Sequence, residues 1–172
     1  MDNVTITLSV SYDEIKTKAL RLLSVLGKRT VTQDGNSQFT RVQVSTAEEP
    51  LIIDFVEKAF QDIMEKIAPC VSNYTDNENG AVCDISFFSW SKLNESAITS
   101  MFRSKVYDYC MSIAIADYLS LYFPQQSQFY KDRAFGILSS ILSVCYTKRP
   151  EEAEGSYFTS TTAGALIGWS GY

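Results

Sequence analysis

The sequence AITSMFRSKVYDYCMSIAIADYLSLYFPQQSQFYKDRAFGILSSILSVCYTKRP, residues 97–150, is the segment from which the fold class of this chain is best predicted. Apolar side chains recur in it at the spacing of a helix that buries one face. They are Met101, Phe102, Val106, Tyr109, Cys110, Ile113, Ala116 and Leu119 in the first half, and Tyr130, Ala134, Ile137, Leu138, Ile141 and Cys145 in the second. Pro124 separates the halves, because proline disfavours helical geometry in the residue before it. The short connection predicts an antiparallel helical hairpin.

Two amphipathic helices are predicted before this hairpin. Ser11 and Glu14 have the spacing of a capping box at the start of the first helix, and Gly27 is expected to end it in a left-handed conformation. Thr46 and Glu49 have the same spacing at the start of the second helix. One apolar stripe then follows the second helix, through Ile52, Phe55, Val56, Ala59, Phe60, Ile63, Met64 and Ile67.

Strands complete the predicted structure. Residues 4–10 (VTITLSV) alternate apolar and polar side chains, and residues 81–90 (AVCDISFFSW) predict a second strand that can pair with them. Residues 30–45 predict a hairpin or an extended loop, and the polar residues 72–80 predict a linking turn. The fold class is therefore α+β and mainly α-helical. It consists of a helical hairpin plus amphipathic helices, with a small β element and an extended C-terminal arm.

The chain is expected to contain one domain and one arm. Its 172 residues, 45% hydrophobic and 20% charged, are typical of a single globular domain with a substantial core. Pro150, followed by EEAE, marks the boundary. Residues 1–150 form the predicted helical domain, and residues 151–172 form the predicted interaction arm.

The arm raises an energetic question, because it carries no charged side chain after Glu154. Full burial of its large side chains contributes roughly 9 to 18 kcal/mol. Ordering about seventeen residues costs about 1 to 2 kcal/mol each, which is a comparable or larger sum. We therefore expect a second polypeptide to complete the arm, for example by strand addition, with a disordered end as the alternative. The large side chains are those of Tyr157, Phe158, Leu166, Ile167, Trp169 and Tyr172.

Composition argues against several classes of function. The net charge of −5 gives no basic field for specific nucleic-acid binding. The chain has no His, which removes Ser-His-Asp and Cys-His catalysis, and its four cysteines form no CxxC pair and are expected to be reduced core thiols. No glycine-rich nucleotide motif is present. We predict no enzyme, no cofactor and no metal site. The apolar stretch CMSIAIADYLSLYF is too short to span a membrane and contains an acid, so no membrane association is predicted.

Asp117 is the acid within that apolar stretch. An isolated buried carboxylate has a raised pKa, which is a mark of active sites. Pairing with Lys131 or Arg133 on the neighbouring helix, or exposure to water, is the favoured interpretation. An enzyme remains an alternative that requires a deep pocket with convergent polar groups near Asp117.

Five tyrosines flank the helical hairpin. Tyrosine is favoured at protein interfaces, since it combines a large contact area with a polar tip. Most of the five are expected in the core and the remainder on a contact surface. They are Tyr107, Tyr109, Tyr118, Tyr122 and Tyr130.

The order of these parts resembles a known family. The segments LSVLGKR, DFVEKAFQDIMEKIAP and AVCDISFF, followed by the helical hairpin that closes in TKRP, are similar to small structural proteins of tailed phages and prophages of gut Bacteroides. More broadly, they resemble the head-to-tail connector (adaptor) proteins that form a ring beneath the portal. The N-terminal strand and residues 39–44 (FTRVQV) depart from the simplest connectors.

The resemblance implies a structural virion protein of the phage neck. Copies are expected to form a homo-oligomeric ring that joins portal or head to tail, with DNA passing through the ring. Lys148 and Arg149, in the basic TKRP, and the arm would contact the portal or other neck and tail proteins. The expected location is the virion, and the host cytoplasm during assembly. A tail-completion (terminator) protein or a small helical regulatory or binding module is the alternative.

Overall fold

The computed structural model describes residues 3–31, 37–88 and 95–146. Along the chain they form β1 (Asn3–Ser11), α1 (Tyr12–Val25), β2 (Gly27–Val31), β3 (Ser37–Arg41) and α2 (Glu49–Ile67). A 3₁₀ turn (Ala68–Cys70), β4 (Val71–Asn77), β5 (Gly80–Phe88), α3 (Glu95–Tyr122) and α4 (Pro124–Cys145) follow. The predicted class, mainly α-helical α+β, is confirmed.

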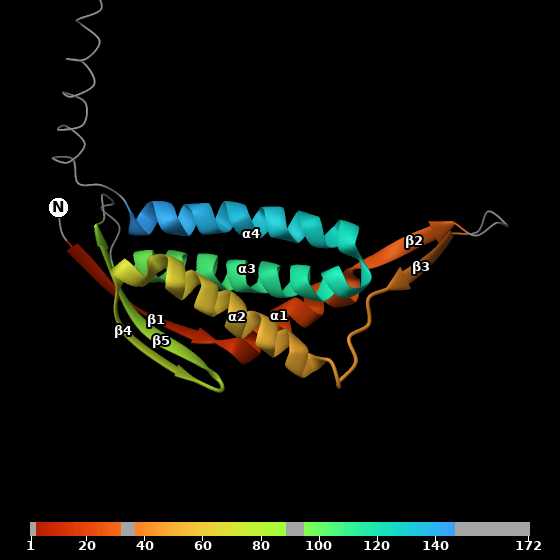
Figure 1. Ribbon diagram of the computed structural model, residues 1–172, viewed down its shortest axis with the longest axis horizontal. Helices are drawn as coiled ribbons and strands as arrows, with labels where there is room; N and C mark the ends of the chain where they lie inside the picture. Colours follow the sequence, from red (N-terminus) through yellow and green to blue (C-terminus); the bar gives the residue numbers. More distant parts are fainter. Residues whose placement is uncertain (1–2, 32–36, 89–94, 147–172) are drawn as a thin grey trace, which may run out of the picture.

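Helices α3 and α4 form the predicted antiparallel hairpin and lie side by side along the body (Figure 1). Pro124 occupies the first turn of α4, where its missing amide donor leaves no helical bond unmade. The face of α4 toward α3 buries Tyr130, Ala134, Leu138, Ile141 and Cys145. Helix α3 also contacts α1, α2 and β1, so it is the central helix of the fold.

A three-stranded antiparallel sheet lies against the helices with the order β1-β5-β4 (Figure 1). β1 pairs with β5 over its whole length, from Asn3 opposite Phe88 to Ser11 opposite Gly80. Ile6, Leu8 and Ile85 face the core, whereas Thr5 and Thr7 of the opposite face are exposed. This period-two burial confirms the predicted pairing of the two strands.

A second, two-stranded ribbon projects from the body at the far end of the helices from the sheet (Figure 1). β2 pairs with β3 from Gly27 opposite Arg41 to Val31 opposite Ser37. The Val42 amide donates to the Leu26 carbonyl at 2.8 Å and closes the base of the ribbon, where Val42 is buried. Of the two predicted alternatives for this region, the hairpin is therefore correct.

Three local predictions were wrong. Gly27 begins β2 and is not a left-handed helix end, since α1 ends at Val25 with an extended cap residue, Leu26. The cap of α2 is Glu48 and not Thr46. Most of residues 72–80 form β4, an edge strand whose outer residues are exposed on both faces and therefore show no hydrophobic alternation.

Candidate interaction surfaces

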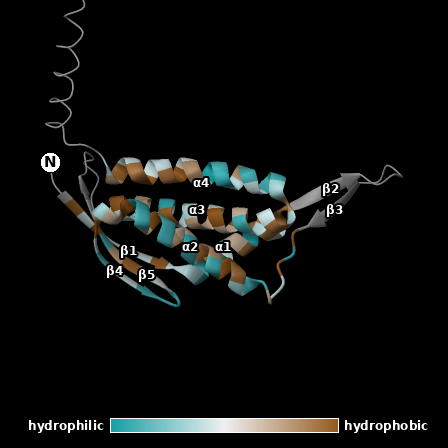
Figure 2. Cartoon of the chain, in the orientation of Figure 1, coloured by the Kyte–Doolittle hydropathy of each residue, from teal (hydrophilic) through white to brown (hydrophobic). Residues whose placement is uncertain are grey.

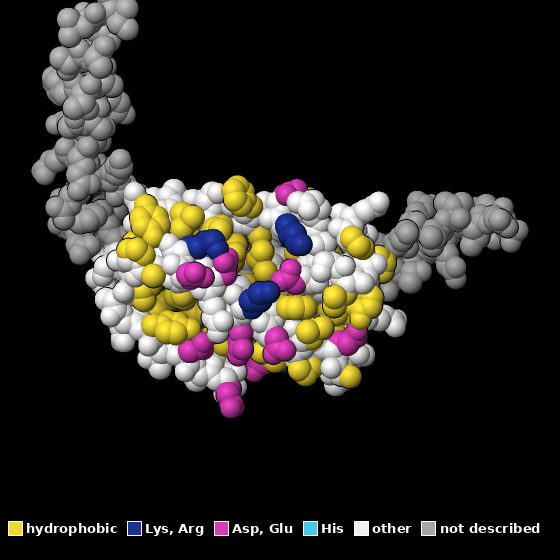
Figure 3. Space-filling model, viewed as in Figure 1, with side chains coloured by type: hydrophobic (Ala, Val, Ile, Leu, Met, Phe, Trp, Pro, Cys, Tyr) yellow, Lys and Arg dark blue, Asp and Glu magenta, His cyan; other side chains and the backbone are white. Residues whose placement is uncertain are grey.

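The outward face of α4 carries the most exposed aromatic side chains of the described residues. Phe135 is 71% exposed and Phe129 is 66% exposed, and Tyr146, just beyond the helix, is 48% exposed. Gly136 directly follows Phe135 and has open space where a side chain would point. Hydrophobic side chains also reach the surface along the edge of the molecule that α4 forms (Figure 3). Large contiguous patches of exposed apolar groups mark interaction surfaces, so this face of α4 is a candidate for one.

A carboxylate holds the segment before α2 to the end of α3. The Glu48 Oε2 atom accepts from the Ser45 amide at 2.9 Å and from the Ser45 hydroxyl at 2.7 Å. Its Oε1 atom accepts from the Tyr122 hydroxyl at 2.7 Å. These donors, the Ser45 amide first, lower the pKa of Glu48 to about 2, and burial, followed by the nearby carboxylate, raises the pKa of Tyr118 to about 12. The bonds fix the segment that leads from the β2–β3 ribbon into α2.

Two open grooves flank this segment. One, of about 510 Å³, is lined by Leu20, Ser24, Val42, Gln43, Val44 and Glu49. The other, of about 280 Å³, is lined by Val42, Gln43, Glu48, Tyr118, Tyr122 and Phe123. The enzymatic alternative requires a pocket with polar groups near Asp117. Asp117 lines neither of these two grooves.

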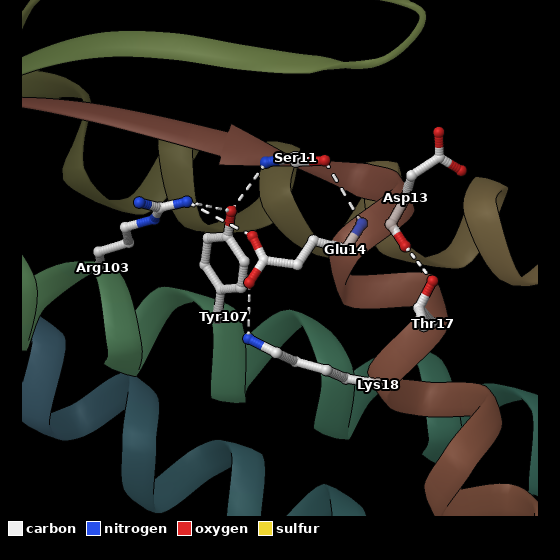
Figure 4. Close-up of polar contacts among 7 residues, drawn as sticks. All are labelled: Ser11, Asp13, Glu14, Thr17, Lys18, Arg103 and Tyr107. Atoms are coloured by element: carbon white, nitrogen blue, oxygen red, sulfur yellow. Dashed lines mark hydrogen bonds and ion pairs between the residues drawn. The ribbon is translucent and has the colours of Figure 1, made fainter.

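A polar network joins the start of α1 to α3 (Figure 4). The Ser11 side chain accepts from the Glu14 amide at 3.3 Å, as the capping box predicted. The Ser11 amide, however, donates to the Tyr107 hydroxyl at 3.0 Å and not to Glu14. The Glu14 carboxylate instead pairs with Lys18 at 2.9 Å and Arg103 at 3.4 Å, and Lys18 is the main cause of its lowered pKa.

Acidic residues gather on the β4–β5 strand pair. Asp76 of β4 accepts from the Tyr12 hydroxyl at 2.8 Å and from the Tyr74 hydroxyl at 2.7 Å. Asp84 of β5 accepts from Thr7 at 2.7 Å on the outer face of the sheet. The turn between the two strands, which contains Glu78, is hydrophilic (Figure 2). Residues 71–88 contain no Lys or Arg, so their net charge is −3.

The predicted catalytic alternative finds no support at Asp117. Its side chain is half-buried, and within the described part of the chain it forms no ion pair with Lys131 or Arg133, which are both exposed. Across the described residues, no group of three or more His, Cys, Asp or Glu side chains could hold a metal ion. Nor is any helix in the described ranges both long and apolar enough to cross a membrane.

The predicted interface residues of the arm, together with Lys148 and Arg149, lie outside the described residues. All four cysteines are described and carry free thiols, of which Cys70 is half-buried and Cys83, Cys110 and Cys145 are buried. The prediction of unpaired thiols is confirmed. The core position is confirmed for three of them.

Three features of these surfaces were missed in the sequence. The exposed Phe129 and Phe135 lie outside the buried stripe of α4, as a helical projection of residues 124–145 shows. The Glu48–Tyr122 bond joins residues 74 positions apart and leaves no local signal. The edge strand β4 could have been suspected only from Tyr74 and Thr75, which favour strands.

The chain was compared with models of protein families, with curated proteins and with solved structures, and it matches none of them.

Proposed function

We propose that this chain is a non-enzymatic structural subunit of the neck of a tailed phage. Copies would form an oligomeric ring that joins the portal, or head, to the tail. The arm of residues 151–172, with Lys148 and Arg149 at its base, would contact an adjacent neck, tail or portal protein. DNA would pass through the ring without specific binding. The protein would be found in the virion, and in the host cytoplasm during assembly.

The observation that carries this proposal is the outward face of α4. Phe129 and Phe135 are exposed on the long helical hairpin, and burying each on a neighbouring copy contributes about 1.5 to 3 kcal/mol. Open space at Gly136 allows a neighbouring backbone to approach α4 closely. In a ring every copy repeats the same contact, so modest pairwise affinities add to a stable assembly.

A tail-completion protein is the alternative within the same class. The N-terminal strand β1 and the ribbon that includes β3, which the simplest connectors lack, keep this alternative open. Both roles require a ring. They differ in the partner, which is the portal for a connector and the tail tube for a terminator.

The proposal is tested by negative-stain imaging and by light scattering of the purified full chain. We expect rings whose mass is a multiple of 19.3 kDa. Phe129→Ser/Phe135→Ser should reduce ring formation at least tenfold in apparent affinity. Leu121→Ser, which removes a 56% exposed side chain from α3, is the matched control and should leave rings intact.

Other outcomes are equally informative. A compact dimer with a dispensable arm would favour a small regulatory or binding module. Rings that are insensitive to the two phenylalanine substitutions would exclude α4 as the contact. A portal or capsid gene beside the gene of this chain would support the phage assignment, and co-sedimentation with the portal or with tail tubes would separate connector from terminator.

A further inference from the structure

The β2–β3 ribbon is a sheet without a partner in the described part of the chain. Its two strands of five residues pair only with each other, so both outer edges are open. A two-stranded ribbon in water is marginally stable, and three strands or a packed face are needed for independent stability. Its base is fixed by the Leu26–Val42 bond, but the rest projects away from the helices (Figure 1). A third strand is therefore expected from another molecule.

The three-stranded sheet offers a suitable edge. In the order β1-β5-β4, strand β4 is an edge of seven residues, and residues 72–79 are all exposed. In an antiparallel ladder every second amide of β4 points away from β5, toward a missing neighbour. One five-residue strand of the ribbon can lie along this edge, which is how extended segments add to exposed sheets.

Charge distinguishes β4 from the other edge, β1. Residues 27–41 contain Lys28, Arg29 and Arg41 against a single acid, Asp34, for a net charge of +2. Residues 71–88 have a net charge of −3, whereas β1 has no charged residue. Opposite charges favour the encounter and fix the partner, so the ribbon is complementary to β4 and neutral toward β1.

The position of the two elements determines the symmetry of the contact. The ribbon and the sheet lie at opposite ends of the body, so the ribbon of one copy cannot reach its own β4 (Figure 1). We propose that the β2–β3 ribbon of each copy adds as a strand to the exposed β4 edge of the next copy. This contact is heterologous, with a donor at one end and an acceptor at the other, and such contacts form rings where the rotation between copies closes and open filaments where it does not. The inference rests on the proposed function and names its second subunit contact.

The experiment compares the full chain with two variants of the ribbon. In one, a short Gly-Ser link replaces residues 28–40 and keeps Leu26 and Val42. In the other, Lys28→Glu/Arg29→Glu repels the acidic edge without shortening the chain. Arg21→Glu/Lys58→Glu changes the net charge equally at exposed positions of α1 and α2, and serves as the control. Melting temperature verifies that each variant is folded.

Hydrogen exchange of the assembled full chain reads out which edge is covered. We expect the peptide that spans β4 to exchange on the order of tenfold more slowly than in the ribbon-shortened variant, while the peptide that spans β1 is unchanged. Both ribbon variants should lose at least tenfold in association, and the control should keep it. Protection of β1 in place of β4 would overturn the assignment of the edge.

The two proposals fail in different ways. Rings that persist in both ribbon variants, with unchanged exchange in β4, would overturn strand addition and leave the proposed ring intact. A full chain that stays monomeric even at millimolar concentration would overturn the proposed ring, and the strand addition with it.

Discussion

The Tyr107 hydroxyl accepts the Ser11 amide hydrogen at 3.0 Å, the bond that a complete capping box would give to Glu14. The same oxygen accepts from Arg103 at 3.0 Å, so one tyrosine of α3 joins the start of α1 to a cation of its own helix. Tyr107 is 5% exposed, and this bond therefore lies at the edge of the core. The start of α1 is thus capped partly by α3 and not by its own sequence alone.

Replacing this tyrosine tests the contact between the two helices. Tyr107→Phe leaves the part-buried Ser11 amide without its acceptor, so we expect a loss of about 1 to 3 kcal/mol in the free energy of unfolding. Urea denaturation measures the loss. Tyr122→Phe breaks the bond from the Tyr122 hydroxyl to Glu48, but this ring is 54% exposed and water can replace the bond, so stability should change by no more than about 0.5 kcal/mol. Equal effects of the two substitutions would refute the special role of Tyr107.

Substitution of alanine at two glycines, Gly80 and Gly136, should change the stability of the fold in opposite directions. At Gly80 a Cβ atom would lie 2.1 Å from the Val10 carbonyl oxygen, and φ is +157°, so Gly80→Ala forces the paired backbones apart. We expect a loss on the order of 3 kcal/mol or more. At Gly136 a Cβ atom meets nothing within 4 Å, and alanine favours the helix interior. Gly136→Ala should therefore stabilise the monomer by roughly 0.5 to 1 kcal/mol.

Thermal unfolding of the two glycine variants, at a concentration that keeps them monomeric, measures whether each substitution raises or lowers the stability. A neutral Gly80→Ala would mean that the β5 start opposite Ser11 is not as close to β1 as the register requires. A destabilising Gly136→Ala would mean that the outer face of α4 is covered within the monomer.

The pattern of side chains was enough to predict the helical hairpin and the β1–β5 pair, because their burial is periodic. The apolar residues of α2 recur at helical spacing and those of β1 at period two, so local sequence reports the buried face. Contacts between residues that are far apart in the chain produce no periodic pattern, so the sequence did not predict them. Tyr107 reaches Ser11 across 96 positions, and Glu48 meets Tyr122 across 74.

The predicted contact surface was only partly right. Of the five tyrosines that flank the helical hairpin, Tyr107, Tyr109, Tyr118 and Tyr130 are buried and only Tyr122 is exposed, close to the expected division. The strongly exposed aromatic residues are the phenylalanines of α4. From the sequence, Phe129 and Phe135 were assigned neither to the buried stripe of α4 nor to a contact surface.

The lowered pKa of Glu48 predicts how the stability of the fold depends on pH. Its pKa is lowered from 4.5 to about 2, so its bonds stabilise the fold fully above pH 4.5, and this contribution is lost as the pH falls from 4.5 toward 2. Ser45→Ala/Tyr122→Phe removes the Ser45 and Tyr122 hydroxyl donors and should raise the pKa of Glu48 part of the way back, since the Ser45 amide and the Tyr118 hydroxyl remain. Carboxyl-carbon NMR titration measures the shift.

The control for this titration is Glu57, whose pKa is raised by burial and by neighbouring acids. Its midpoint should be the same in the double variant and in the parent chain. A Glu48 midpoint near 4.5 in the parent would show that the carboxylate does not hold the segment before α2.

The cysteines provide the last prediction, because their environments differ. Burial raises the pKa of all four thiols, to about 12 for Cys83 and Cys145, so few are thiolates near neutral pH. Cys70 is only half-buried, and its thiol donates to the Cys145 carbonyl at 3.4 Å.

A thiol reagent should therefore label Cys70 first and slowly in the native chain, and the others only on unfolding. Mass spectrometry of partly labelled protein identifies the site, and Cys70→Ser should abolish the early phase. Rapid labelling of Cys110, which is fully buried between the helices, would show that α3 separates from its neighbours in the native state.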